Sequence, residues 1–379
     1  MNRQEELKLT EEVLELKSAK SAFLGDGVER LSYDNYRSEE RFRNELDKVF
    51  RQLPHAIAHG SALEGPDTFL RASHAGVPLL ITRDSDGVPH AFVNTCRHRG
   101  MQLVAEQSGC AKRFTCPYHA WSYGTDGGFL TAPHFDQGFG ELDKAELGLK
   151  SVSCVERFGF IWITLDASSR DHVDDLFAPI AEDFESLRIE GLRVAHETVV
   201  QVEANWKLLV EGGLEAYHFK VAHKDTIGPY FENNLSTFQV FGDHIRSVLP
   251  RATLADSDVQ DDSFRLLDHA NILYVLFPTT QLLVQQDHIV WTQTNPISPG
   301  LTESRMVTLV PAEDLEGEKA QGYWAKNHHI TCTTLGEDSS VAEGIQRSIN
   351  AGFDQTMILG RFESALGAFN DTVTRRLAS

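Results

Sequence analysis

The sequence of 379 residues predicts an α+β protein, in which a small all-β unit precedes an antiparallel sheet covered by helices. Two observations support this fold class. Between about residues 50 and 165, short apolar runs alternate with turn residues, as in a small all-β domain. Beyond residue 166, helical patterns flank a second group of apolar strands, and segregated strands and helices are typical of α+β folds.

These patterns divide the chain into three parts: an N-terminal helical arm (1–48), an all-β domain (49–166) and an α+β domain (167–379). In the arm, Glu, Lys and Leu recur at helical spacing over 3–23. Over 38–50 the apolar residues Phe42, Leu46 and Phe50 are four apart. We expect the arm to pack with the third part.

The all-β domain contains a clear hairpin pattern. Residues 77–82 and 89–94 are apolar strand candidates, and the Asp84–Gly87 segment between them has turn chemistry. The segment 158–164 predicts a further strand.

The last part begins with a predicted helix at 171–187 and a strand at 194–202. A helix is predicted over 208–220, although Gly212 and Gly213 weaken it. Strands are expected at 271–277, 281–284, 289–294 and 305–310. Helices are expected at 316–332, 339–350 and 355–377.

Composition narrows the function classes. The chain has 35 Lys and Arg against 55 Asp and Glu, a formal charge of −20, which disfavours binding to nucleic acid or to an anionic membrane surface. Five cysteines favour a reduced, intracellular setting. The acidic first 25 residues are unlike a signal peptide, and no apolar run approaches the ~20 residues of a membrane helix, so we expect a cytoplasmic protein.

Two Cys-His pairs form the first candidate site. Cys96 and His98 are followed, after a gap of 17 residues, by Cys116 and His119, all within the all-β domain. Two thiolates and two imidazoles suit either a structural zinc ion or a Rieske 2Fe-2S cluster. Because each pair contributes one Cys and one His, both Cys can bind one iron and both His the other, and this order favours the cluster.

A carboxylate and two histidines form the second candidate site. On a helix, Glu215 and His218 would share one face, whereas His218 and His223 would lie about 140° apart. The two imidazoles can meet one metal only if the helix bulges or ends between them. Two His and a carboxylate are the ligands of non-haem iron(II) oxygenases.

The residues around the Cys-His pairs, Asn94-Thr-Cys-Arg-His-Arg-Gly100 and Cys116-Pro-Tyr-His-Ala-Trp-Ser-Tyr123, resemble the Rieske domain of ring-hydroxylating oxygenase large (alpha) subunits. The resemblance implies that Cys96 and Cys116 hold the buried iron of the cluster, and that His98 and His119 hold the outer iron. Most family members have Gly at the position of Ala120.

The segment from Asn205-Trp-Lys207 to His223 resembles the catalytic domain of the same family, for which a helix-grip, START-like fold is implied. By this resemblance His218 and His223 bind the mononuclear iron and a downstream carboxylate is the third ligand. We predict Asp338 for that role, with Asp354 as its rival and Glu343 as a weaker candidate.

Glu215 matches the acid that, in the family, connects the cluster ligand His119 of a neighbouring subunit to His218. In most members this acid is Asp. Because the two metal centres of one subunit lie too far apart for fast electron transfer in the family, the resemblance implies a head-to-tail homotrimer.

The function implied is that of the terminal oxygenase of a Rieske system. Its cofactors would be the 2Fe-2S cluster and Fe(II), with O2 as co-substrate and NAD(P)H acting through a separate flavin/iron-sulfur reductase and possibly a ferredoxin. The substrate would be a small aromatic or quaternary ammonium compound that is monohydroxylated, dihydroxylated or demethylated. The alternative is a Rieske electron carrier with a non-catalytic ligand-binding domain. Candidate pocket residues are Ile227, Tyr230, Phe231, Phe238, Phe241, Leu273, Tyr274 and Leu283, with Arg246 and Arg251 as possible carboxylate-binding residues.

Overall fold

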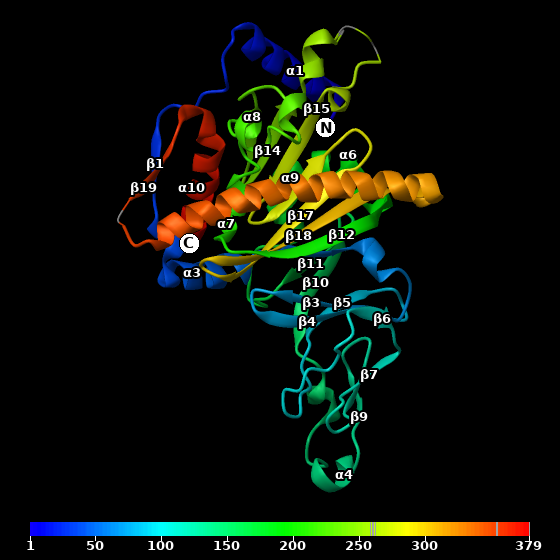
Figure 1. The fold of residues 1–379 in the computed structure, drawn as a ribbon. Coiled ribbons are helices and arrows are strands. Elements are labelled where there is room, and N and C mark those ends of the chain that lie inside the picture. The colour runs from blue at the N-terminus through cyan, green and yellow to red at the C-terminus, as the bar shows by residue number, and fades with distance from the viewer. Residues whose placement is uncertain (258, 260, 262, 354, 379) are drawn as a thin grey trace. The chain divides into compact units, whose positions relative to one another are not determined.

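The computed structural model describes the whole chain except residues 258, 260, 262, 354 and 379 (Figure 1). The chain forms two compact units. The small unit comprises Phe50–Val173, and the large unit comprises Met1–Val49 together with Asp174–Ser379. The N-terminal arm is therefore part of the same unit as the C-terminal half of the chain.

The small unit is built from antiparallel strands. A seven-stranded sheet has the order β2-β11-β10-β5-β4-β3-β6, and a three-stranded sheet has the order β7-β8-β9. The bounds are β2 His55–His59, β3 Thr68–His74, β4 Val77–Arg83, β5 Pro89–Val93, β6 Ser108–Cys110, β7 Arg113–Thr115, β8 Ser122–Gly124, β9 Phe129–Thr131, β10 Ser151–Arg157 and β11 Phe160–Thr164, with a short helix α4 at Phe135–Gly138. The three strands predicted in this part of the sequence are confirmed as β4, β5 and β11.

The hairpin of β4 and β5 shows how local chemistry sets this unit's register. Asp84 Oδ1 accepts hydrogen bonds from the backbone N–H groups of Asp86 and Val88, and Gly87 takes the left-handed φ of 84° that closes the turn. The register pairs Leu79 with Val93. The alternation that follows directs apolar side chains of β4 into the core of the unit.

The large unit contains a second seven-stranded antiparallel sheet, in the order β12-β18-β17-β16-β15-β14-β13. The bounds are β12 Leu192–Val202, β13 Thr237–Phe241, β14 His244–Pro250, β15 Ala270–Leu276, β16 Thr280–Val284, β17 Ile289–Ser298 and β18 Leu301–Pro311. A separate pair joins β1 (Glu29–Ser32) to β19 (Thr356–Leu359). The sequence patterns had identified β12 and β15 to β18, but had missed β13, β14, β1 and β19.

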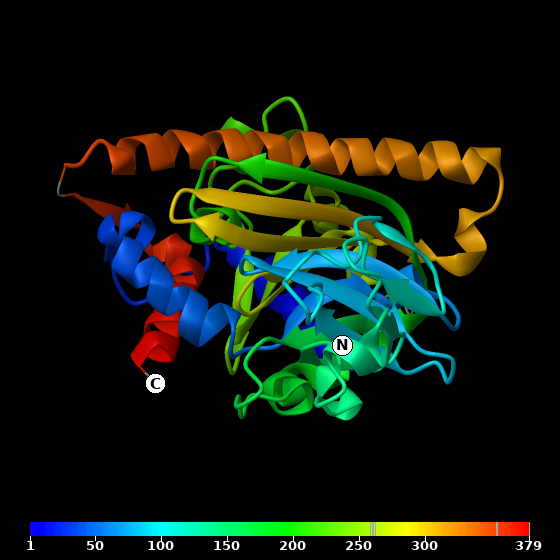
Figure 2. The same ribbon diagram turned by 90° about the horizontal axis from the view of Figure 1, so that it is seen from below.

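The long helix α9 lies along β12 and β18 of this sheet (Figures 1 and 2). The helices of the large unit are α1 Arg3–Ser18, α2 Asp34–Arg37, α3 Glu39–Glu45, α6 Ala181–Leu187, α7 Trp206–Glu211, α8 Phe219–Ala222, α9 Glu318–Asn350 and α10 Ser364–Ala378. Helix α5, Val173–Phe177, begins at the last residue assigned to the small unit. Among the described residues, no helix combines the length and the apolar character that crossing a membrane requires.

Four of the predicted helices differ from the observed ones in their bounds or in their number. The segments 316–332 and 339–350 belong to the single helix α9, and 355–377 contains β19 as well as α10. The helix predicted over 208–220 ends at Glu211, and Gly212 and Gly213 follow it. At Gly213 an added Cβ would lie 3.2 Å from Leu273 Cδ2, so close packing on the sheet favours glycine there.

Candidate metal centres

Two loops of the small unit carry the Cys-His pairs and have matching backbone geometry. The N–H of Gly100 donates to the carbonyl of Cys96, and the N–H of Ala120 donates to the carbonyl of Cys116, each at 3.0 Å. Gly100 and Ala120 both have a left-handed backbone, with φ of 74° and 56°. Each loop is thus a tight turn that directs its Cys and His side chains to the same side.

The four side chains of these loops converge. Cys96 and Cys116 are each 3% exposed, whereas His98 and His119 are partly exposed and their Nδ1 atoms are 3.2 Å apart. Two imidazole nitrogens at that separation fit two ligands of one iron at bonds of ~2.1 Å. The donor set therefore suits a Rieske cluster, with thiolates on the buried side and imidazoles on the outer side.

Aromatic side chains support both kinds of ligand. The Tyr123 hydroxyl accepts a hydrogen bond from the Arg97 N–H at 3.0 Å and is hydrogen-bonded to Cys96 Sγ at 3.3 Å. The Trp121 ring stacks on His98 with centroids 5.1 Å apart. Burial raises the pKa of the Cys96 thiol, and burial together with the neighbouring His119 lowers the pKa of His98. A metal would compensate the buried thiolate charge, and the neutral imidazole is the form that binds metal.

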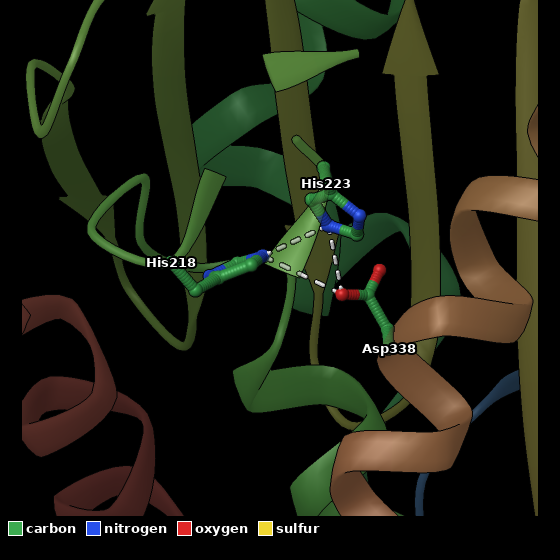
Figure 3. Close-up of side chains that lie close together, drawn as sticks. All are labelled: His218, His223 and Asp338. Carbon is green, nitrogen blue, oxygen red and sulfur yellow. Dashed lines mark hydrogen bonds and ion pairs between the residues drawn. The ribbon is translucent and has the colours of Figure 1, made fainter. Parts of the chain in front are cut away.

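The second site lies in the large unit, between the segment around α8 and the middle of α9 (Figure 3). His218 and His223 flank the single turn of α8, and Asp338 projects toward them from α9. His218 Nε2 lies 3.1 Å from His223 Nε2 and 3.4 Å from Asp338 Oδ1, and His223 Nε2 lies 3.0 Å from Asp338 Oδ1. One donor atom from each of these three side chains lies within 4.8 Å of the other two, so the three could hold a single metal ion.

The three separations fit a facial set of metal ligands. Three donors bound at ~2.1 Å to one ion, at mutual angles near 90°, lie ~3.0 Å from one another. The observed 3.0, 3.1 and 3.4 Å match that arrangement, which leaves the opposite side of the ion open. Two imidazoles and one carboxylate are the donors that non-haem iron(II) uses.

Two more carboxylates contact the two imidazoles at their Nδ1 atoms, whereas the Nε2 atoms belong to the three-donor cluster. Glu215 contacts His218 Nδ1 and also accepts from the His218 backbone N–H, and Glu337 Oε2 lies 2.7 Å from His223 Nδ1. Burial alone would lower the pKa of His218, but Asp338 and Glu215 raise it to about 9. The pKa of Asp338 is held below its usual range by the two imidazoles, against the effect of burial. Three acids around two imidazoles create a site that favours a cation.

The structure brings together all three residues predicted from the sequence to hold the mononuclear metal. Of the rival ligands, Glu343 lies on α9 with its carboxylate 3.3 Å from the Glu203 backbone N–H, and it is not part of the three-donor cluster. Asp354 lies outside the described residues. The sequence had pointed to Glu337 only as the neighbour of Asp338 in a Glu-Asp pair that resembles the family's, and its contact with His223 was not predicted.

Candidate pocket residues prove to lie on opposite faces of the sheet. Leu273 and Leu283 are cross-strand partners, and Leu273 is on the face that meets Gly213. The next residue, Tyr274, points to the other face, where its hydroxyl donates to Asp183. Arg246 is held there by Asp183 and Glu5, so its guanidinium serves an internal ion-pair cluster rather than a substrate.

Comparison with protein families gives two matches that together span most of the chain. Residues 189–379 match the ring hydroxylating alpha subunit (catalytic domain) family, and residues 54–153 match the Rieske [2Fe-2S] domain family. The first match covers half of the chain and contains His218, His223 and Asp338. The second contains both Cys-His pairs.

Among curated relatives, the large subunit of anthranilate 1,2-dioxygenase from Acinetobacter baylyi is 27% identical over 260 residues, which cover 67% of this chain and 55% of the relative. The oxygenase subunit of glycine betaine monooxygenase from Pseudomonas aeruginosa is 32% identical over 197 residues, or 52% and 45% of the two chains. The chain thus matches about half the length of these relatives. The crystal structure of a quaternary ammonium Rieske monooxygenase shares the fold, with a TM-score of 0.81 at 22% identity over 92% of this chain and 96% of that one.

Proposed function

The chain belongs to the Rieske ring-hydroxylating alpha-subunit family, and we propose that it is the terminal oxygenase of a Rieske system. The observation that carries the proposal is the facial arrangement of His218, His223 and Asp338, with donor atoms 3.0–3.4 Å apart. A protein that only carries electrons needs the ligands of its cluster but not a second set of metal ligands such as these three. We infer an enzyme that combines O2 with a small organic substrate.

The geometry of each site supports the proposed roles of the metal ligands. Cys96, Cys116, His98 and His119 would hold the 2Fe-2S cluster, and His218, His223 and Asp338 would hold a mononuclear Fe(II). When bound, the cluster supplies single electrons, and the ferrous ion supplies the position at which O2 is activated. The protein supplies orientation and exclusion of water: His223 is 1% exposed, and Phe219 packs edge-on against its ring.

Glu215 is proposed as the electron-transfer bridge. It contacts His218 Nδ1, so it holds that imidazole in the tautomer whose Nε2 faces the metal. We propose that its carboxylate also meets His119 of a neighbouring subunit in a head-to-tail homotrimer. A ring of this kind uses heterologous interfaces that close after three copies.

The substrate and partners are proposed by class. The named relatives act on an aromatic acid and on a quaternary ammonium compound. We propose a small substrate of one of these two kinds, which is monohydroxylated, dihydroxylated or oxidatively demethylated. NAD(P)H would supply electrons through a separate flavin/iron-sulfur reductase, with or without a ferredoxin.

The test is an iron assay combined with a substrate screen under isotopically labelled O2. We expect three irons per chain in the wild type and two in the His218→Ala variant, which keeps the red-brown cluster but forms no labelled product. Glu343→Ala, a control on α9 outside the three-donor cluster, should keep three irons and full turnover. Two irons per wild-type chain would indicate an electron carrier instead.

A further inference from the structure

Glu337 joins two parts of the metal site that are far apart in the sequence. Its Oε2 atom lies 2.7 Å from His223 Nδ1 and 2.7 Å from Thr226 Oγ1, although 114 residues separate it from His223. The neighbouring residue Asp338 meets the same imidazole at Nε2, at 3.0 Å. Two consecutive residues of α9 therefore hold both ring nitrogens of one histidine, on the side of the site where Figure 3 shows Asp338 approaching.

This contact determines which nitrogen of His223 carries the proton. An ionised carboxylate only accepts hydrogen bonds, so Nδ1 of His223 must be the donor to Glu337. In the neutral ring the lone pair is then on Nε2, which faces His218 Nε2 and Asp338 Oδ1. Because the His223 side chain is 1% exposed, bulk water does not reach its ring to replace Glu337 as the hydrogen-bond acceptor.

Thr226 fixes the carboxylate itself. Its hydroxyl donates to the same oxygen that accepts from His223, and its backbone N–H donates to the His223 carbonyl at 3.1 Å. The turn after α8 therefore presents two donors, one imidazole and one hydroxyl, to a single acid of α9. This arrangement positions the histidine relative to the helix that also carries Asp338.

We propose that Glu337 is a positioning residue for the mononuclear metal, which holds His223 in the metal-binding tautomer and links it to α9. The inference rests on the metal site proposed above and adds a residue to which no role had been assigned. Glu337 orients His223 through its Nδ1 atom, as Glu215 orients His218. Glu215 comes from the same segment as its histidine, whereas Glu337 comes from the helix of the third ligand, so it also sets the distance between the two sides of the site.

The test measures Co(II) binding at the mononuclear site, in holoprotein that retains its oxidised cluster and has been depleted of mononuclear iron. Chelator competition gives the affinity. The paramagnetic resonance of high-spin Co(II) reports ligand geometry, because the oxidised cluster contributes no signal. The variants are Glu337→Ala, Glu337→Gln and Thr226→Val. Glu343→Gln is the matched control, since it removes one carboxylate from the same helix outside the donor cluster.

We expect Glu337→Ala to weaken Co(II) binding by about 10- to 100-fold and to change the resonance signal, because His223 loses its orienting partner. Glu337→Gln keeps a carbonyl acceptor, so it should keep the wild-type signal and lose less than about tenfold. Thr226→Val should fall between Glu337→Gln and the wild type. The control should stay within about twofold of the wild type.

Wild-type affinity and an unchanged signal in Glu337→Ala would overturn the positioning role alone. Equal weakening in Glu337→Ala and Glu343→Gln would also overturn it, since the effect would then be one of overall charge. If His218→Ala binds Co(II) as tightly as the wild type does, the proposed metal site and this inference both fail. That result can be told apart from the two outcomes above, which leave the metal site in place.

Discussion

At the scale of single residues, Ala120 adopts a backbone conformation that alanine rarely takes. Its φ of 56° is close to the 74° of Gly100, the equivalent residue in the other cluster loop. Both residues donate their N–H to the carbonyl of the cysteine four positions earlier. A left-handed conformation costs a residue with a Cβ about 1–2 kcal/mol, whereas glycine adopts it without that cost.

We therefore predict that Ala120→Gly raises the stability of the small unit by about 1 kcal/mol, after the greater freedom of glycine in the unfolded chain is subtracted. The mirror change Gly100→Ala should cost a similar amount, since no atom of the surroundings lies within 4 Å of the added Cβ. Thermal unfolding of holoprotein, followed by loss of cluster absorbance, measures both. Shifts of the same sign in the two variants would contradict this account.

Glu211 is a second residue whose surroundings set its chemistry. It is 5% exposed and accepts hydrogen bonds from the Tyr36 hydroxyl and the Asn370 amide, each at 2.8 Å. Burial raises its pKa to about 7, against the opposing effect of these two donors. The nearby Lys207 is itself paired with Glu45 at 2.6 Å.

This pKa makes stability depend on pH. Between the unfolded value of about 4.5 and the folded value of about 7, the folded state holds a proton that the unfolded chain has released. The contribution of Glu211 to stability is therefore full below pH 4.5, falls as the pH rises to 7 and is constant above that. We predict that Glu211→Gln gains stability relative to the wild type from pH 5 to pH 8, by roughly 3 kcal/mol at most. Denaturant unfolding at several pH values measures it, and parallel curves for the two proteins would refute it.

At the scale of elements, α9 is continuous over 33 residues where the sequence predicted two helices. The interval between the predicted helices contains Gly336, a poor helix former. Packing against the sheet overrides that local preference: Trp324, Ala342 and Ile349 are buried along the helix. Continuity matters for the metal site, because it presents Glu337 and Asp338 from a rigid helix interior.

Gly336 is therefore a residue at which α9 can be made more stable. It is exposed, and an added Cβ would meet nothing within 4 Å. We predict that Gly336→Ala stabilises the large unit by about 0.5–1 kcal/mol without changing the Co(II) affinity of the site. Thermal unfolding and the chelator competition measure the two effects. A loss of affinity would show that α9 needs flexibility at Gly336.

At the scale of the whole molecule, the chain separates its two sets of ligands into two compact units. Cys96 and His119 belong to the small unit, and His218 and Asp338 belong to the large unit. Because the proposed electron path runs from the cluster of one copy to the iron of the next, function would be a property of the ring rather than of the single chain.

Mixed rings test this proposal. His119→Ala removes the cluster side of the path and Glu215→Gln removes the bridge, so each variant alone should be inactive. Refolded or co-expressed together in equal amounts, they should recover about a quarter of the wild-type turnover, because about one junction in four joins an intact cluster to an intact bridge. No recovery, in mixtures shown by mass to contain both variants, would place the electron path within one chain.

The sequence by itself determined the local chemistry of both sites. Cys96 and His98, Cys116 and His119, and His218 and His223 each lie within one turn or one short helix, so residue spacing limits how their side chains can meet. The strands β4, β5, β11 and β15 to β18 were also predictable, because apolar runs and turn residues act over a few positions.

Only the tertiary structure decided which distant groups complete those sites. Asp338 was selected over Asp354 and Glu343 by resemblance to a family, and its distance of 3.0 Å from His223 depends on how α9 packs across the sheet. The contact of Glu337 with His223, the continuity of α9 through Gly336 and the face on which Tyr274 lies have the same origin. Such contacts depend on packing energies summed over many residues, whereas spacing along the chain constrains only near neighbours.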